Sequence, residues 1–319
     1  MKLLKFVFSG VLLCSFAFAG SSIAQTPEAA KPAAKAELKD LVLKGDAKCT
    51  ECHDEADAPG LLHIGKTRHG VTADSRTPTC TKCHGESAAH TDYKGKDKPP
   101  KTEVSFGRTS KTTPQAKNDA CLTCHQKDAK RSHWEGSAHQ SKDVACSSCH
   151  EIHAATDKVR DKKTEAEVCY TCHKEQRAQI SKTSRHPIPE GKMSCSDCHS
   201  AHGSAGPSLM VRDSVVDTCY SCHMEKRGPF VRNHQPVQED CSICHNPHGT
   251  TTPAMLKARQ PYLCQQCHEP GTSHQGNVAS LTGTSTSANT AGRGCLNCHT
   301  QIHGTNNPAS IANERTFRR

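Results

Sequence analysis

The sequence has 319 residues, of which only 4% are aromatic and 34% hydrophobic, and the hydrophobic share includes 21 cysteines. This composition excludes the apolar core of an ordinary globular enzyme. The net charge of +9, from 41 Lys and Arg against 32 Asp and Glu, would by itself indicate nucleic acid or an acidic membrane as partner.

Residues 1–24 have the features of a secretory signal peptide. Two lysines precede an apolar run at 6–18, and the small residues after it place cleavage after Ala24 or, as a weaker alternative, after Ala19. A membrane anchor is the other interpretation, but the run is shorter than the about 20 residues that a spanning helix needs. Cys14 lies within the run and does not follow the small residue that a lipoprotein site requires. We therefore expect the mature chain outside the cytoplasm.

The mature chain is predicted to have mobile ends. Residues 25–48, rich in Ala, Lys and Pro, read as a flexible leader with a short amphipathic helix at 37–43. Residues 275–294 read as a flexible loop, and residues 304–319 as a flexible basic tail. The part between them, 49–303, carries the motifs.

Ten copies of Cys-x-x-Cys-His occupy this part and use every cysteine except Cys14. The pattern is the attachment signature of a c-type haem, because two thiols on one helical turn reach both vinyl groups of a porphyrin and the next histidine reaches its iron. Zinc and disulfide redox sites can produce one Cys-x-x-Cys, but not ten without an orphan. The predicted cofactors are ten covalently bound haem c groups. They are attached at Cys49 and Cys52, Cys80 and Cys83, Cys121 and Cys124, Cys146 and Cys149, Cys169 and Cys172, Cys195 and Cys198, Cys219 and Cys222, Cys241 and Cys244, Cys264 and Cys267, and Cys295 and Cys298, with motif histidines His53, His84, His125, His150, His173, His199, His223, His245, His268 and His299.

Ten bound haems would account for the low hydrophobic content and would reverse the sign of the net charge. About thirty residues per haem are too few for an ordinary core, so the porphyrins must form it. The predicted fold is a multihaem cytochrome c, mostly irregular chain with short helices wrapped around a row of ten haems and little or no β-sheet. Twenty propionates would bring the mature protein to a charge of about −3 when oxidised and about −13 when reduced. Lysines and arginines then serve as their counter-ions, and nucleic acid is excluded as a partner.

The motifs form five two-haem units, each with one histidine between its motifs and one after the second. The units are 49–90, 121–153, 169–202, 219–248 and 264–303. The histidines in these slots are predicted to be the second axial ligands: His69, His90, His139, His153, His186, His202, His234, His248, His274 and His303. His63 and His133 are left over. His63 could replace His69 as a ligand, and His133 could replace His139.

Three of the second ligands follow a motif histidine by three residues. On a helical turn, His153, His202 and His248 would face the same way as the motif histidine beside them. They cannot hold one iron from opposite sides, so each is expected to reach a neighbouring haem. Which haem each second ligand reaches stays open.

Iron with two protein ligands has no open position for a substrate, and no motif departs from histidine, so the sequence favours an electron carrier over an enzyme. Methionine could ligate haem iron, but the histidines already suffice. Arg177 and Arg227, at matching repeat positions, could pair with propionates or be solvated, and both interpretations stay open.

The mature chain resembles the periplasmic decahaem cytochromes of the MtrA and MtoA type, the DmsE family. The resemblance rests on the ten motifs and on Cys-Tyr-Ser-Cys-His-Met-Glu-Lys-Arg-Gly-Pro at 219–229, Cys-His-Asn-Pro-His-Gly at 244–249, Leu-Cys-Gln-Gln-Cys-His at 263–268 and Cys-Leu-Asn-Cys-His at 295–299. It implies a periplasmic protein associated with the outer membrane inside a porin-like β-barrel. Electrons would pass through it for extracellular metal reduction or Fe(II) oxidation. Further partners would be an outer-surface multihaem cytochrome or extracellular iron, and periplasmic or inner-membrane cytochromes.

The polar mature sequence agrees with a barrel partner, since a conductor that crosses a hydrocarbon layer about 30 Å thick needs a lipid-facing sheath. One alternative is a soluble periplasmic shuttle to a terminal reductase. Another is a multihaem oxidoreductase acting on a small oxyanion. Direct Fe(II) oxidation or metal reduction at exposed haems is compatible with the electron-carrier interpretation.

Overall fold

The computed structural model describes residues 46–71, 76–107, 109–268, 294–297, 299–307 and Phe317. These residues belong to one unit of the chain, Asp40–Arg319. The predicted signal peptide, the helix at 37–43, nearly all of the loop at 275–294 and most of the tail lie outside the described residues.

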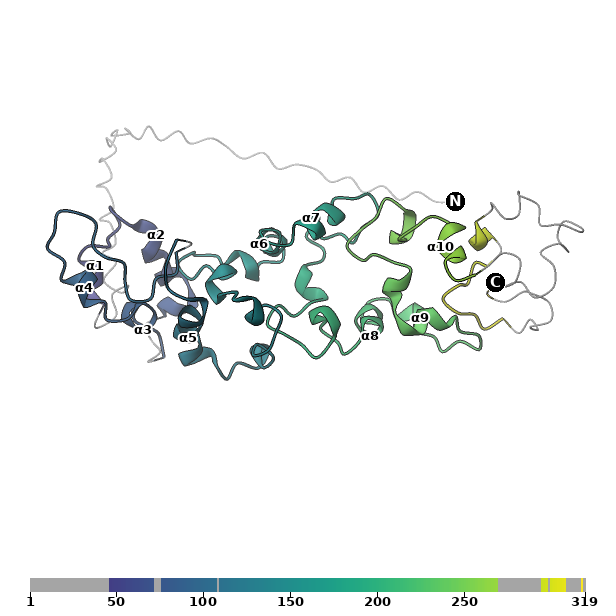
Figure 1. Cartoon of the computed structure of the whole chain (residues 1–319), viewed down its shortest axis with the longest axis horizontal. Helices are drawn as coiled ribbons and strands as arrows, with labels where there is room; N and C mark the ends of the chain where they lie inside the picture. The colour runs from purple at the N-terminus through teal and green to yellow at the C-terminus, as the bar shows by residue number, and fades with distance from the viewer. Residues whose placement is uncertain are drawn as a thin grey trace, which may run out of the picture. The chain divides into compact units, whose positions relative to one another are not determined.

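Short helices joined by irregular chain make up the described part (Figure 1). Its longest helix has 12 residues, α5 at Pro114–His125, which starts with Pro at N1 and with Thr113 Oγ1 accepting from Ala116 N at 3.2 Å. The described residues form no β-strand, only isolated bridges such as Ser184 to Thr250. The predicted fold class is confirmed. The α-helices are α1 Ala47–Thr50, α2 Pro59–Leu62, α3 Cys80–His84, α4 Ala88–Thr91, α5 Pro114–His125, α6 Glu165–Cys169, α7 Lys174–Ile180, α8 Val215–Tyr220, α9 Gln235–Glu239 and α10 Tyr262–Gln265. The 3-10 helices are η2 His63–Lys66, η3 Arg68–Gly70, η4 Ala129–Arg131, η5 Gln140–Lys142, η6 Cys146–Ser148, η7 Lys158–Arg160, η8 Cys195–Asp197, η9 Pro207–Leu209, η10 Met224–Lys226, η11 Cys241–Ile243, η12 Pro253–Met255 and η14 Cys295–Asn297.

Apolar side chains do not form a central core in the described part of the chain. The buried hydrophobic residues are Trp134, Ala145, Ala166, Tyr170, Ile180 and Val216, and no large side chain is fully buried. Three of them, Ala166, Tyr170 and Ile180, pack together with Ile188 and Cys195. Searching the same residues for a helix that is long and apolar enough to cross a membrane finds none.

The two motifs of a unit have different local structures. The first motif follows or ends a short α-helix, as in α5 and α8, whereas the second motif usually begins a 3-10 turn, as in η6 and η8. Both kinds close with the same backbone bond, in which the motif histidine donates its N–H to the carbonyl of the first cysteine. The distance is 2.9 Å in motifs of both kinds, such as His173 to Cys169 and His199 to Cys195. This closed turn places the two thiols and the imidazole close together.

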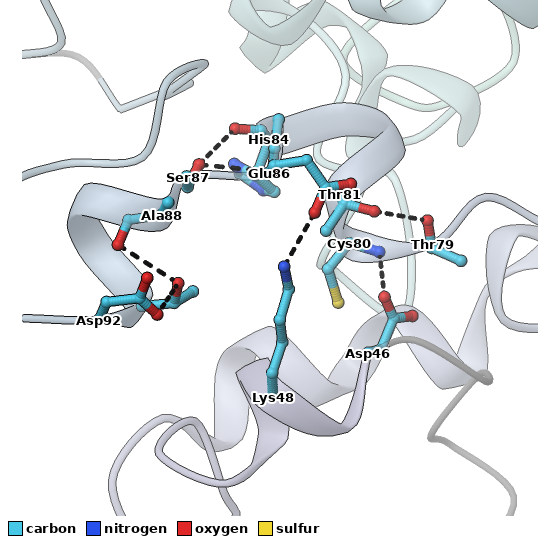
Figure 2. A network of polar contacts seen from close by, with 12 residues as sticks. Asp46, Lys48, Thr79, Cys80, Thr81, His84, Glu86, Ser87, Ala88 and Asp92 are labelled. Carbon is cyan, nitrogen blue, oxygen red and sulfur yellow. Dashed lines mark hydrogen bonds and ion pairs between the residues drawn. The ribbon is translucent and has the colours of Figure 1, made fainter.

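A polar side chain at the helix before the first motif ties the two motifs of a unit together. In the first unit, Asp46 Oδ1 accepts from the backbone N of Cys80 at 2.7 Å (Figure 2). Beside it, Lys48 Nζ lies 2.9 Å from Glu86 Oε2. Asp46 is buried, so its hydrogen bond replaces the water that the free N–H groups of the second turn would otherwise need.

Three other units repeat this tie with different side chains. Asn118 Oδ1 accepts from Cys146 N at 2.7 Å, Glu165 Oε1 from Ser196 N at 2.7 Å, and Gln260 Oε1 from Leu296 N at 2.9 Å. In the fourth unit, Asp240 caps its own turn instead, accepting from Ser242 N at 2.7 Å.

Two glycines that follow second-ligand histidines allow adjoining units to pack closely. Gly203 and Gly249 have φ values of 105° and 134°, which disfavour any residue with a side chain. A Cβ atom on Gly203 would overlap the carbonyl oxygen of His133, and one on Gly249 would overlap that of Gln179. The His-Gly step of these units is therefore required by backbone packing between units.

Candidate haem-binding sites

Nine motif histidines in the described part of the chain each lie beside one further histidine. The ring centroids of these pairs are 5.9–6.3 Å apart. The pairs are His53 with His90, His125 with His69, His84 with His153, His173 with His139, His150 with His202, His223 with His186, His199 with His248, His268 with His234, and His245 with His303.

This spacing suits a metal ion between two imidazoles. A metal–nitrogen bond is about 2 Å long, and a ring nitrogen lies about 1 Å from its ring centroid, so opposite axial ligands have centroids about 6 Å apart. Stacked imidazoles in direct contact would lie closer together. The arrangement has the dimensions that an axially ligated haem iron requires.

The pairs follow one rule along the chain. The histidine between the motifs of a unit pairs with the first motif of the next unit, as His139 does with His173. The histidine after the second motif pairs with the second motif of the preceding unit, as His202 does with His150. At the N-terminal end, where no unit precedes, His90 pairs with His53 of its own unit.

The three histidines that sit three residues after a motif histidine avoid that neighbour, as the helical-turn argument requires. His153, His202 and His248 pair with His84, His150 and His199, each from the motif two positions earlier. They therefore pass over the adjacent motif in the sequence.

The two left-over histidines take other positions. Neither His63 nor His133 belongs to the nine pairs, whose places are filled by His69 and His139. His63 begins η2, and the carbonyl of His133 faces Gly203. His274 and Cys298, both predicted to belong to the haem site of the tenth motif, lie outside the described residues.

Backbone carbonyls orient seven of these imidazoles through Nδ1. Because Nδ1–H donates to the carbonyl, Nε2 is left as the metal-binding nitrogen. The bonds run from His84 to Val104 (2.9 Å), His90 to Pro100 (2.6 Å), His139 to Ala201 (2.8 Å), His153 to Leu61 (2.8 Å), His186 to Pro247 (2.8 Å), His199 to Ser208 (2.9 Å) and His245 to Ala254 (2.8 Å). His150 differs, because its acceptor is the carboxylate of Asp157 at 2.7 Å.

Burial keeps several of these histidines neutral. It lowers the pKa of His69, His84, His202, His234, His248 and His303 below the usual value, because an imidazolium loses hydration when it is buried. Neutral imidazole is the form that binds a metal ion, so the local environment favours the ligating state.

The first cysteines of the two motifs in a unit are in contact. A hydrogen bond from Cys121 lowers the pKa of Cys146 to about 7, and one from Cys219 lowers that of Cys241 to about 7. The same contact joins Cys169 to Cys195, Cys49 to Cys80 and Cys264 to Cys295. No disulfide joins any of the described cysteines.

The second cysteines link one unit to the next. Burial raises the pKa of Cys83, Cys149, Cys198 and Cys244, and a nearby thiol from the next unit raises it further. Those neighbours are Cys124, Cys172, Cys222 and Cys267 respectively. Together with the contacts inside units, every motif therefore lies next to the following motif from the first to the tenth.

Buried donors without partners fit the propionates of a bound haem. Arg131 Nη2, Arg185 Nε and the hydroxyl of Tyr170 are buried without a hydrogen-bond partner. The Arg131 side chain is 13% exposed, and Arg185 adjoins the paired His186. A carboxylate-bearing group would satisfy such arginines, so the residues present fit haem. The Arg177 guanidinium lies 6.0 Å from the centre of the Tyr170 ring.

One further cluster has metal-binding residue types. The ligand atoms of Glu165, Cys169 and Cys195 lie within 4.8 Å of one another. The carboxylate oxygens of Glu165 already accept from the backbone N of Ser196 at 2.7 Å and from its hydroxyl at 2.8 Å. Both thiols belong to haem motifs, so this cluster is part of the structure around the haems.

Sequence features missed much of what orients the histidines. The carbonyls of Pro100 and Val104, which lie outside all the motifs and histidine slots, accept from two imidazoles. Carbonyl acceptors leave no residue-type signal in a sequence. Asp157, four residues after a second-ligand slot, could have been found by its charge.

Comparison with known proteins agrees with this geometry. A doubled CXXCH motif family matches residues 186–228 and 234–273, and a family of NrfB-like c-type cytochrome proteins matches 80–167. The cytochrome c-type protein NrfB of Haemophilus influenzae is 31% identical over 147 residues, 40% of this chain and 64% of that one. The multiheme cytochrome MtrA of Shewanella baltica is 43% identical over 274 residues, 83% of this chain and 80% of that one. The chain therefore belongs to the MtrA family of multihaem c-type cytochromes, proteins that bind haem c and transfer electrons.

Proposed function

We propose that this cytochrome carries ten haems as a continuous electron conductor and works inside a porin-like barrel of the outer membrane. The observation that carries the conductor is the succession of neighbouring cysteines, in which the first cysteines of each unit are hydrogen-bonded and a second cysteine of each of the first four units lies near one of the next. Because each motif lies next to the following one, the groups attached to them would be close neighbours along the whole series.

The residues have distinct roles in this proposal. Each cysteine pair holds one haem by two thioether bonds, and each histidine pair supplies the two axial ligands of one iron. His274 is assigned to His299, because the nine observed pairs use the other second-ligand histidines. When bound, haem iron supplies one-electron chemistry between Fe(III) and Fe(II). With both axial positions occupied, the protein leaves no position for a substrate, which supports a carrier over an enzyme.

The barrel partner and the place in the cell rest on the family. The MtrA-type resemblance implies a periplasmic protein associated with the outer membrane through a barrel, with electron partners on both sides. The terminal acceptor or donor would then be an outer-surface cytochrome or extracellular iron. The polar surface of the described residues, rich in exposed lysine and glutamate, suits the water-lined interior of such a barrel.

Proteoliposomes test the conductor and the partner together. Vesicles loaded with a reduced dye would contain the barrel alone, the cytochrome alone, or both, with insoluble ferric oxide outside. We expect dye oxidation only when both proteins are present and a complex that survives purification in detergent. Equal rates with the barrel alone, or no stable complex, would instead favour a soluble periplasmic shuttle.

A further inference from the structure

Among the paired histidines whose Nδ1 bonds are described above, His150 alone donates to a carboxylate rather than to a carbonyl. Its Nδ1 lies 2.7 Å from Asp157 Oδ2, and the two side chains are 29% and 17% exposed. The second ring at this site is His202, with its centroid 6.1 Å from that of His150. The Asp157 carboxylate therefore lies directly behind one of the two histidines of the fourth haem-binding site.

The loop between the two residues holds Asp157 in this position. Its other oxygen, Oδ1, accepts from Glu151 N at 3.3 Å, and its backbone carbonyl accepts from Arg160 N at 3.0 Å, where η7 begins. Both carboxylate oxygens are thus used within one short loop. The contact is built into the backbone fold and does not depend on a freely rotating surface side chain.

A second carboxylate near a motif histidine lacks these features. Glu225 Oε1 lies 3.6 Å from His223 Nδ1, and these side chains are 61% and 53% exposed. That distance is too long for a hydrogen bond, and the exposed pair is well screened by water. The fourth motif is therefore the site where the carboxylate contact is short and shielded.

A carboxylate that accepts the Nδ1–H of a metal-bound imidazole draws the proton toward itself and makes the ligand more basic. A more basic ligand, with a full negative charge behind it, stabilises Fe(III) relative to Fe(II) and lowers the reduction potential. We propose that Asp157 is a positioning residue that lowers the reduction potential of the haem held between His150 and His202. That potential would then lie below those of haems whose axial histidines donate to carbonyls. This inference rests on the proposed ligation.

One cation near the same site acts in the opposite sense. Burial is the main cause of the lowered pKa of His202, and the nearby charge of Arg131 lowers it further. Asp128, whose carboxylate lies 3.7 Å from the Arg131 guanidinium, offsets part of that charge. An arginine close to the iron favours Fe(II), so the net potential reflects both charges. Replacing Asp157 alone isolates the carboxylate, since Arg131 and the His202 side of the site stay in place.

Redox titration of the purified holoprotein tests the assignment. In Asp157→Asn, an amide oxygen replaces the carboxylate, so the hydrogen bond can persist without the charge. We expect about one tenth of the haem absorbance to titrate at a higher potential, with a tenfold shift of that ferric–ferrous equilibrium, or about 59 mV for one electron. Asp157→Glu, which keeps the carboxylate, should titrate close to the unmutated protein.

Asp161→Asn is the matched control. Asp161 lies four residues away with similar exposure, and its Oδ1 accepts from Lys163 N at 3.0 Å without contacting a paired histidine. It makes the same change in net charge and should leave the titration unchanged. A titration of Asp157→Asn that superimposes on that of the unmutated protein, or an equal shift in Asp161→Asn, would overturn the proposal.

Two measurements separate this result from the proposed ligation itself. Haem stoichiometry by mass shows that each variant is loaded, and Asp157→Ser supplies a second neutral replacement if Asp157→Asn loads fewer haems. The low-spin spectrum of the unmutated protein and the appearance of one high-spin haem in His202→Ala test the ligand pair. Failure of those two tests refutes the ligation, whereas an unshifted titration with both intact refutes the role of Asp157 alone.

Discussion

Replacing His248 by Ala should convert one low-spin haem to the high-spin state. The His248 ring lies 6.1 Å from that of His199, and a methyl group at position 248 is too short to reach a metal between them. His199 keeps its own support, because its Nδ1 lies 2.9 Å from the carbonyl of Ser208. The affected iron therefore keeps one axial ligand and loses the other.

The size of the effect follows from the pairing. One iron in ten is affected, so about one tenth of the haem should show the high-spin signal while the rest of the spectrum is unchanged. Electron paramagnetic resonance with spin quantification measures this fraction directly. External imidazole should restore the low-spin state, because the vacated space has the size of one imidazole ring.

His133→Ala is the control, since it removes an imidazole from a residue outside the nine pairs. Its spectrum should match that of the unmutated protein, and so should that of His63→Ala. A low-spin spectrum for His248→Ala, or a high-spin haem in His133→Ala, would refute the assignment of axial ligands by repeat position and ring spacing.

Three further predictions test the cofactor count and the packing. Intact-protein mass after signal removal should show ten covalently bound haems, and eight or fewer would refute the conductor. Gly249→Ala should destabilise the holoprotein by about 1–3 kcal/mol in thermal unfolding, because φ is 134° and the added Cβ would meet the carbonyl of Gln179. Gly60→Ala is the control. Gly60 lies in α2 with no atom within 4 Å of the added Cβ, so this change should be close to neutral. Asn118→Leu should lower the free energy of unfolding by about 1–3 kcal/mol, because it removes the acceptor for the backbone N–H of Cys146. Gln115→Leu, on the exposed face of α5, is the matched control and should change that free energy by less than about 0.5 kcal/mol.

The sequence predicted those features that depend on residue type and spacing. The Cys-x-x-Cys-His spacing predicted the closed turn, and nine of the ten histidine slots of the repeat hold a ring that the structure places beside a motif histidine. The ring beside His125 is that of His69, where the sequence had left His63 as an alternative. The scarcity of aromatic and aliphatic residues predicted an irregular chain with short helices, and the described residues have that fold.

Features that depend on contacts between distant backbone segments could not be predicted from the sequence. A histidine does not reveal which iron it faces: His153 reaches the second motif of the preceding unit, where it also donates to the carbonyl of Leu61, 92 residues away. Every residue has a carbonyl, so composition and periodicity cannot indicate which one accepts from an imidazole. The four polar ties between motifs were missed for a related reason: Asp, Asn, Glu and Gln each make one of them, so no residue type repeats at that position.

Because histidines pair between units by one rule, the number of units in such a chain can change without loss of ligands. Each middle unit gives one histidine to the unit before it and one to the unit after it, and it receives one from each in return. If residues 169–218 were deleted as a block, His139 would meet His223 of the next unit in place of His173, and His248 would meet His150 in place of His199. A complete middle unit can thus be lost or duplicated while every iron keeps two ligands, and only the two ends need their own arrangement. In the proposed conductor, the number of units would therefore set the length, in steps of two haem-binding motifs.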